Sequence, residues 1–139
     1  MKKIRTFSVM LAMMLAILLI TSCGSPEDNL PGNWVTESVE ATVDSTKASA
    51  ANLASVDMAI ASAKTTTFTL NDDHTMVLTI DGYRSDAFWA YNSENNMITF
   101  MFEEGDVGDP IELGRLDGNK ILYTSSVKNG NITSVYVKE

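Results

Sequence analysis

The chain has 139 residues, with 18 Asp and Glu against 10 Lys and Arg, one His and one Cys. This length suits a single domain, and the acidic balance argues against nucleic-acid binding, which needs a positive field to displace counterions from phosphates. One Cys and one His also exclude a disulfide framework and a Cys/His metal site, so we expect no metal and no cofactor.

The N-terminal segment combines a short cationic stretch with an apolar run. Lys2, Lys3 and Arg5 are the only charged residues before residue 24, and residues 9–20 are all apolar. A membrane-spanning helix needs about 20 apolar residues, whereas the apolar core of a secretory signal has roughly 7–15. The run is therefore predicted to belong to a cleaved signal.

Residues 20–23, Ile-Thr-Ser-Cys, resemble the lipobox of bacterial lipoproteins. The resemblance implies that residues 1–22 are a signal peptide and that Cys23 carries diacylglycerol and becomes an acylated N-terminus bearing fatty acids such as palmitate. Two or more acyl chains make a stable membrane anchor. Residues 23–30 are then the lipidated Cys and a flexible tether. Gly24, in place of an Asp after the Cys, implies the outer membrane, on its periplasmic or cell-surface face.

The rest of the chain is more polar than the average suggests. Residues 24–139 hold every acidic residue and seven of the ten basic ones, for a formal charge of −11, and about 40% of them are apolar. A domain of this size buries roughly 65–70% of its unfolded surface, so a modest core is expected.

Short strands separated by turns are predicted beyond the tether. Turn residues recur at regular spacing, and the runs between them alternate apolar and polar residues, which is typical of an all-β sandwich or barrel. Asn129 and Gly130 predict a type I′ hairpin, in which both residues adopt positive φ. Residues 97–102 are apolar on both faces, which predicts a strand covered on both sides. The eight predicted strands are residues 34–43, 65–70, 76–80, 83–91, 97–102, 111–113, 121–127 and 135–137.

Residues 45–64 differ from this pattern, because they are rich in Ala and contain no Gly or Pro. We predict an amphipathic helix over about residues 47–63, with Ser45 or Thr46 as the N-cap. It is expected to lie across one end of the sheet as a lid or plug. Its apolar stripe consists of Leu53, Val56, Ile60 and Ala63.

Three motifs resemble the lipocalin-like domains of bacterial lipoproteins. Residues 30–34, Leu-Pro-Gly-Asn-Trp, match the L-x-G-x-W opening; residues 68–75 resemble the F-x-F-x-x-D-G-T hairpin, with a Leu and a His as departures; and residues 85–91 resemble the strand with a second Trp. The resemblance implies an eight-stranded up-and-down lipocalin-like β-barrel over residues 31–139. In it, Gly32 lets the chain turn into the first strand and Trp34 plugs one end. Closure also removes exposed strand edges.

The barrel interior is the candidate site. A small eight-stranded barrel either fills with side chains or holds one small ligand. Aromatic faces suit an apolar or sugar ligand and an Arg suits an anion, while ordinary core packing is the alternative for each residue. The predicted ligand-lining residues are Trp89, Tyr91, Arg115, Tyr123 and Tyr136.

Other polar groups have simpler interpretations. His74 beside two Asp residues lacks the nucleophile that a catalytic pair needs, so it is interpreted as a solvated turn residue. The acidic residues 103–109 do not follow the spacing of a calcium-binding EF-hand loop and are interpreted as a solvated loop. Residues 44–46, Asp-Ser-Thr, resemble an O-glycosylation acceptor motif, with Ser45 or Thr46 as the acceptor.

We therefore expect a lipid-anchored, outer-membrane binding or interaction module that holds a small hydrophobic or sugar-like ligand, and not an enzyme. Its expected partners are the membrane, through Cys23, and a small molecule or an envelope protein, but not nucleic acid. One alternative is a structural or accessory subunit of an envelope complex, docking through residues 97–102 without a ligand. Another is a small hydrolase, which needs two titratable groups in one cleft. A cavity above about 300 Å³ favours ligand binding.

Overall fold

The computed structural model describes residues 24–105 and 108–139. The predicted signal peptide and Cys23 lie outside the described residues. The elements in chain order are the 3-10 helix η1 (Pro26–Asn29), β1 (Gly32–Val43), α2 (Ala50–Thr65), β2 (Thr67–Leu70), β3 (Thr75–Ile80), β4 (Tyr83–Asn92), β5 (Met97–Met101), β6 (Ile111–Asp117), β7 (Lys120–Val127) and β8 (Gly130–Lys138).

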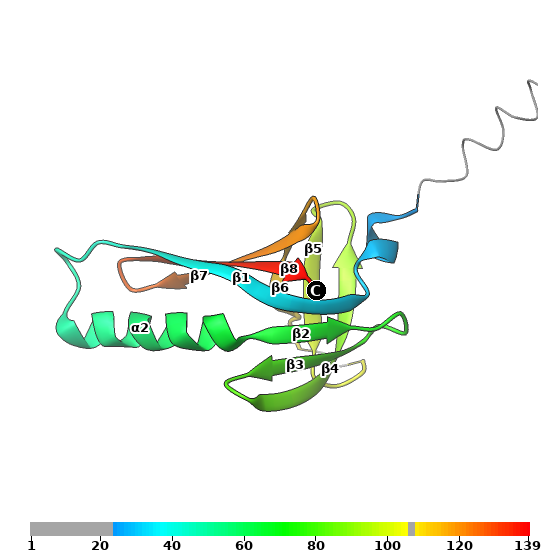
Figure 1. Ribbon diagram of the computed structural model, residues 1–139, viewed down its shortest axis with the longest axis horizontal. Coiled ribbons are helices and arrows are strands. Elements are labelled where there is room, and N and C mark those ends of the chain that lie inside the picture. The colour runs from blue at the N-terminus through cyan, green and yellow to red at the C-terminus, as the bar shows by residue number, and fades with distance from the viewer. Residues whose placement is uncertain (1–23, 106–107) are drawn as a thin grey trace, which may run out of the picture.

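The eight strands form a closed antiparallel barrel, in which each strand pairs with the next and β1 pairs with β8 (Figure 1). This confirms the predicted up-and-down barrel with one helix. Side chains alternate along each strand, so every second residue enters the interior. The buried core is Leu30, Trp34, Phe68, Leu70, Met76, Leu78, Ala87, Trp89, Ile98, Phe100, Leu113, Ile121 and Tyr136.

Some strand predictions are wrong in extent or burial. β6 and β8 continue well beyond residues 111–113 and 135–137, because backbone pairing needs no apolar side chains on the outer face of a barrel. The strand predicted at residues 97–102 is not covered on both sides. Its outward residues are only half-buried, and Phe102, just past its end, is 51% exposed.

The type I′ turn forms at a different hairpin from the one predicted. Val127 pairs with Gly130, so Gly130 belongs to β8, and a Cβ built on it would lie 2.0 Å from the Thr42 carbonyl oxygen. The glycine therefore permits close approach to β1. Positive φ at two adjacent turn residues occurs instead at Asp81 (51°) and Gly82 (82°), between the paired ends of β3 and β4.

Helix α2 begins three residues later than predicted. Its N-cap is Ser49, whose Oγ accepts a hydrogen bond from the Asn52 N–H at 3.3 Å. Neither Ser45 nor Thr46 caps it, because these residues form a separate turn in which the Asp44 carboxylate accepts from the Thr46 N–H and hydroxyl. Within the described residues, the structure contains no helix with the length and apolarity needed to cross a bilayer.

Helix α2 covers part of the edge of β1. The first strand is twelve residues long, yet β2 pairs only with its residues Gly32–Val35. Beyond this point α2 runs alongside β1 (Figure 1), and Thr36 Oγ1 lies 2.8 Å from the carbonyl oxygens of both Ala63 and Thr66. The helix thus takes the place that a longer β2 would occupy.

Candidate functional site

A cavity of about 300 Å³ occupies the end of the barrel that α2 borders. Side chains of β3, β5, β6, β7 and β8 form its wall, and the C-terminal half of α2 adds two small residues. The lining is largely apolar, with three aliphatic hydroxyls, two tyrosines and one carboxylate. The lining residues are Ala59, Ala63, Thr66, Leu78, Ile80, Phe100, Ile111, Glu112, Leu113, Tyr123, Ser125, Ile132, Ser134 and Tyr136.

Trp34, the residue expected to act as a plug, is buried at the opposite end of the barrel. Its side chain is 2% exposed and stacks against Phe68 with ring centroids 6.3 Å apart. The indole Nε1–H donates to the Leu30 carbonyl at 2.9 Å, which fixes the entering chain beneath the ring. Gly32 has φ of 145° and lies against the Lys138 side chain, so this position favours glycine.

The chain just before the barrel is ordered against the closed end. In the segment expected to be a flexible tether, Pro26–Asn29 forms a capped 3-10 helix and Leu30 is fully buried. Lys138 Nζ donates to the carbonyls of Asn29 and Pro31 at 2.6 and 2.7 Å. Only Gly24 therefore separates Cys23 from Ser25, the N-cap of this helix.

Two of the five predicted ligand-lining residues line the cavity. Tyr123 and Tyr136 lie in its wall, where burial raises the pKa of the Tyr136 phenol and outweighs the opposing effect of a hydrogen bond with Ser134. Tyr136 is therefore neutral at physiological pH and is able to donate a hydrogen bond.

Trp89, Tyr91 and Arg115 lie elsewhere. Trp89 and Tyr91 follow the inward alternation of β4 but come near its closed-end terminus, where the Tyr91 hydroxyl donates to Asn96 Oδ1 at 2.8 Å. Arg115 is exposed. The register of β6 against β5 shifts between Ile98 and Thr99, and this bulge turns Arg115 outward.

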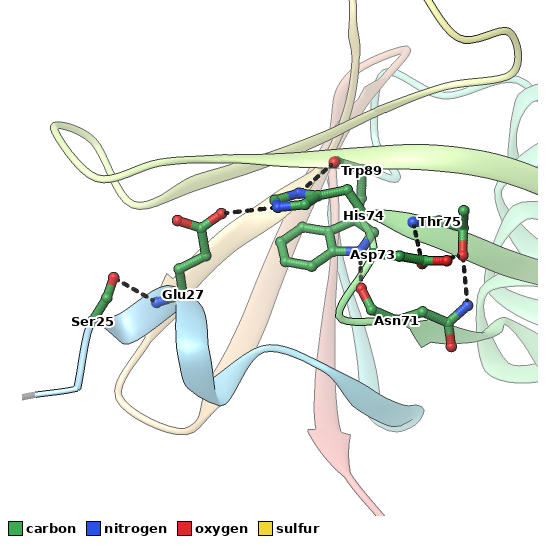
Figure 2. A network of polar contacts seen from close by, with 7 residues as sticks. All are labelled: Ser25, Glu27, Asn71, Asp73, His74, Thr75 and Trp89. Atoms are coloured by element: carbon green, nitrogen blue, oxygen red, sulfur yellow. Dashed lines mark hydrogen bonds and ion pairs between the residues drawn. The ribbon is translucent and has the colours of Figure 1, made fainter.

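His74 helps to close the end of the barrel opposite the cavity (Figure 2). Its ring stacks on Trp89 at 4.7 Å, and its Nδ1 lies 3.3 Å from the Trp89 carbonyl oxygen. Nε2 lies 3.8 Å from Glu27 Oε1 of η1. The Trp89 Nε1–H in turn donates to the Asn71 carbonyl at 3.0 Å. The imidazole is thus a half-exposed cover over Trp89, in the turn where it was predicted.

Helix α2 is fixed to the rim of the cavity by the carboxylate of Asp81. Asp81 accepts hydrogen bonds from the hydroxyls of Ser62 at 2.6 Å and Thr65 at 2.7 Å, and these bonds lower the pKa of its carboxyl. The β3–β4 turn is thereby joined to the last turn of the helix. Ala59 and Ala63 face the cavity at this point, so the helix borders this end of the barrel while it lies alongside β1.

Sequence reasoning missed the polar lining of the cavity. Ser125 lies on the same face of β7 as Tyr123, and Ser134 lies on the same face of β8 as Tyr136, so alternation contained a signal for both. Thr66 follows α2 directly and is 8% exposed. Glu112 had no such signal, because it reaches the cavity from the edge of β6.

No metal centre is visible in the part of the chain that the structure describes, where no group of three or more His, Cys, Asp or Glu side chains is placed to hold an ion. In the acidic loop, Glu103, Glu104 and Asp109 are exposed, and Asp106 lies outside the described residues. Comparison of the chain with protein-family models, curated proteins and solved structures finds no match.

Proposed function

We propose that the protein is a lipid-anchored, outer-membrane binding module of lipocalin-like architecture whose cavity holds a small neutral ligand, hydrophobic or sugar-like. The observation that carries this proposal is the cavity itself. Its volume of about 300 Å³ lies at the lower end of the range for small-molecule sites. It corresponds to roughly ten water molecules at about 30 Å³ each.

The lining supports a neutral ligand with both apolar and hydroxyl groups. Phe100, Leu113 and Ile132 offer apolar surface, on which each buried methylene contributes about 0.8 kcal/mol. The hydroxyls of Ser125 and Ser134 and the phenol of Tyr136 are the kind of sparse polar groups that orient a ligand. The described lining contains no Lys or Arg, so an anionic ligand has no partner there.

The position of the predicted anchor supports capture from the aqueous side. Gly24, one residue after Cys23, lines a groove at the closed end together with Trp34 and Lys138. If Cys23 carries acyl chains, the membrane lies at this end, and the α2 end with the cavity faces away from it. A ligand then enters without passing through the bilayer.

Native mass spectrometry of the domain of residues 24–139 tests this function, because this range contains all eight strands and α2. A small molecule retained after purification supports the proposal. Titration with the neutral fluorophore phenylnaphthylamine gives a second readout. The Ala63→Leu variant places three additional carbon atoms at the cavity wall and is expected to weaken probe binding at least fivefold. Ala61→Leu on the exposed side of the same helix is the control, and equal effects of the two variants would contradict the proposed site.

The second candidate, a structural or accessory subunit of an envelope complex, is favoured by one observation. Phe102, at the end of the predicted docking strand, is 51% exposed and packs edge-on against Phe100 at 5.5 Å. Its replacement by Ser should reduce assembly into a larger detergent-extracted complex and leave probe binding unchanged. Loss of probe binding alone would instead place Phe102 in the ligand site.

A further inference from the structure

The barrel wall separates between β6 and β7 in the half that contains the cavity. These strands are paired at Arg115↔Leu122, Leu116↔Ile121 and Asp117↔Lys120. Beyond Leu122, β7 continues through Val127 and pairs with β8 on one side, but no described strand pairs with its other side. We call the segment Tyr123–Val127 the free edge of β7. The corresponding edge of β1 is partly covered by α2, so among the described residues one side of this extension has a covering element and the other does not.

Gly114 lies at the point where the two strands separate. It lies at a bulge, since Ile98 pairs with Gly114 and Thr99 with Glu112, leaving Leu113 without a cross-strand partner on β5. Its φ is 148°, and a Cβ there would lie 2.7 Å from Ile121 Cγ2 and 2.8 Å from the Leu122 carbonyl oxygen. The glycine thus permits close contact with β7 at the last paired residues. A bulge also bends the strand that carries it, and the preceding residues of β6 leave β7 from there.

The gap leads into the cavity. Ile111, Glu112 and Leu113 all line it, although successive side chains of a strand point to opposite faces. The cavity therefore reaches the edge of β6 as well as its inner face. Tyr123 and Ser125 line it from the β7 side of the gap. An extended chain lying along β7 would direct alternate side chains into the gap between β6 and β7.

Within the part of the chain that the structure describes, the free edge of β7 lacks the usual features that prevent strand addition. Natural edges are protected by Pro, by charged residues, by bulges or by a covering element. Tyr123 to Val127 contains neither Pro nor a charged residue, and its register with β8 is continuous. Its unpaired backbone groups are suited to an extended peptide, which supplies the complementary N–H and C=O groups at the spacing of a strand.

Charge defines the partner further. The β6 side of the gap carries Glu112, and the loop that leads to it carries Glu103, Glu104 and Asp109, all exposed. Between residues 102 and 114 the sequence contains no Lys or Arg. A basic chain is attracted to the acidic β6 side of the gap. A second copy of this protein would be repelled, because residues 24–139 carry a formal charge of −11.

We propose that the free edge of β7 binds an extended, basic polypeptide segment by strand addition, with alternate apolar side chains of that segment entering the cavity. This inference rests on the proposed binding function, because it uses the same cavity, and it names a polypeptide as a ligand class beyond the small neutral molecule. Main-chain hydrogen bonds to β7 orient the bound segment, and the acidic β6 side of the gap makes a basic segment the preferred ligand.

The test uses fluorescence anisotropy of a labelled synthetic peptide of alternating valine and lysine, with the domain of residues 24–139. Two further peptides carry N-methyl groups on one or the other alternate set of amides. Strand addition to one edge uses only one set, so at least one methylated peptide should bind at least tenfold more weakly than the unmethylated peptide. Equal affinity of all three, or no binding of the unmethylated peptide, overturns the proposal.

Protein variants test whether the acidic β6 side of the gap contributes to peptide binding. Glu112→Gln should weaken binding of the unmethylated peptide about threefold at low salt, and Glu94→Gln, an exposed change in the β4–β5 turn, should leave it unchanged. Equal effects of the two variants contradict the charge argument. Phenylnaphthylamine binding on the same samples separates the two proposals, since probe binding without peptide binding overturns strand addition and leaves the proposed function standing. A stable dimer that binds no peptide would assign the edge to a second copy and also overturn the proposal.

Discussion

Truncation of Trp34 gives the sharpest test of how the closed end of the barrel is held. The side chain is 2% exposed, stacks on Phe68 and donates a hydrogen bond to the Leu30 carbonyl. Trp34→Ala removes all of these interactions and leaves a cavity, and large-to-small substitutions of this kind cost about 3–5 kcal/mol. Domains have a stability of roughly 0.05–0.15 kcal/mol per residue, so the loss is a large fraction of the total.

The same change can be expressed as a shift in melting temperature. The entropy of unfolding is about 2.1 cal/mol/K per residue near 60 °C, which gives about 0.24 kcal/mol/K for residues 24–139. Trp34→Ala should therefore lower Tm by about 12–20 °C. Trp34→Phe keeps a ring but removes the indole donor and leaves the Leu30 carbonyl unpaired, which should cost about 1–3 kcal/mol.

Circular dichroism melts and urea titrations of the domain measure both variants. Tyr83→Ala is the matched control, because Tyr83 is 82% exposed and surface changes of this kind stay within about 0.5 kcal/mol. If Trp34→Ala melts within about 3 °C of the wild-type domain, the indole is not a plug, and the account of the closed end given by its contacts is wrong.

Three further predictions concern the anchor and the dependence of stability on pH. Cys23→Ala should move the full-length protein from the detergent-extracted membrane fraction to the soluble fraction, and continued membrane association would contradict lipidation. Because hydrogen bonds lower the pKa of Asp81, its ionised form stabilises the fold above the unfolded value near 4, and this contribution is lost as pH falls through the folded pKa. Asp81→Asn should therefore flatten the decline of Tm below pH 4, and Asp57→Asn on exposed α2 should not. Because burial raises the pKa of Tyr136, its contribution to stability is complete below the unfolded value near 10 and is lost as pH rises through the folded pKa. Tyr136→Phe should reduce the loss of Tm above pH 10. An unchanged dependence of Tm on alkaline pH would show that burial does not raise the pKa of this phenol.

Local patterns were sufficient to predict the barrel, whereas the position of Trp34 at one end was implied by the resemblance to lipocalin-like domains. Alternation placed Phe68, Leu78 and Trp89 inside, and short polar runs placed the turns between strands. The L-x-G-x-W motif implied that Trp34 lies at one end of the barrel, and the structure places this side chain in the buried core. The strand and turn predictions succeeded because strand periodicity and turn composition depend on residues only a few positions apart.

Positions along the barrel axis could not be predicted in the same way. Tyr136 and Trp89 are both inward-facing aromatic residues, but Tyr136 lines the cavity and Trp89 lies under His74 at the opposite end. Alternation reports the face of a strand and not the depth at which a residue lies. Depth depends on the stagger of neighbouring strands, which is set by tertiary pairing.

By itself, the sequence determined an acidic all-β domain with one helix, a lipobox-like segment ahead of it and a Trp at one end of the barrel. Only the tertiary structure decided the position of the cavity, the outward orientation of Arg115 and the free edge of β7. All three depend on how strands far apart in sequence meet. The bulge at Gly114 reverses the alternation of β6 and separates it from β7, and a one-residue change of register moves side chains to the opposite face. The local sequence around Arg115 contains no sign of this bulge, because the bulge exists only in the pairing of β5 with β6.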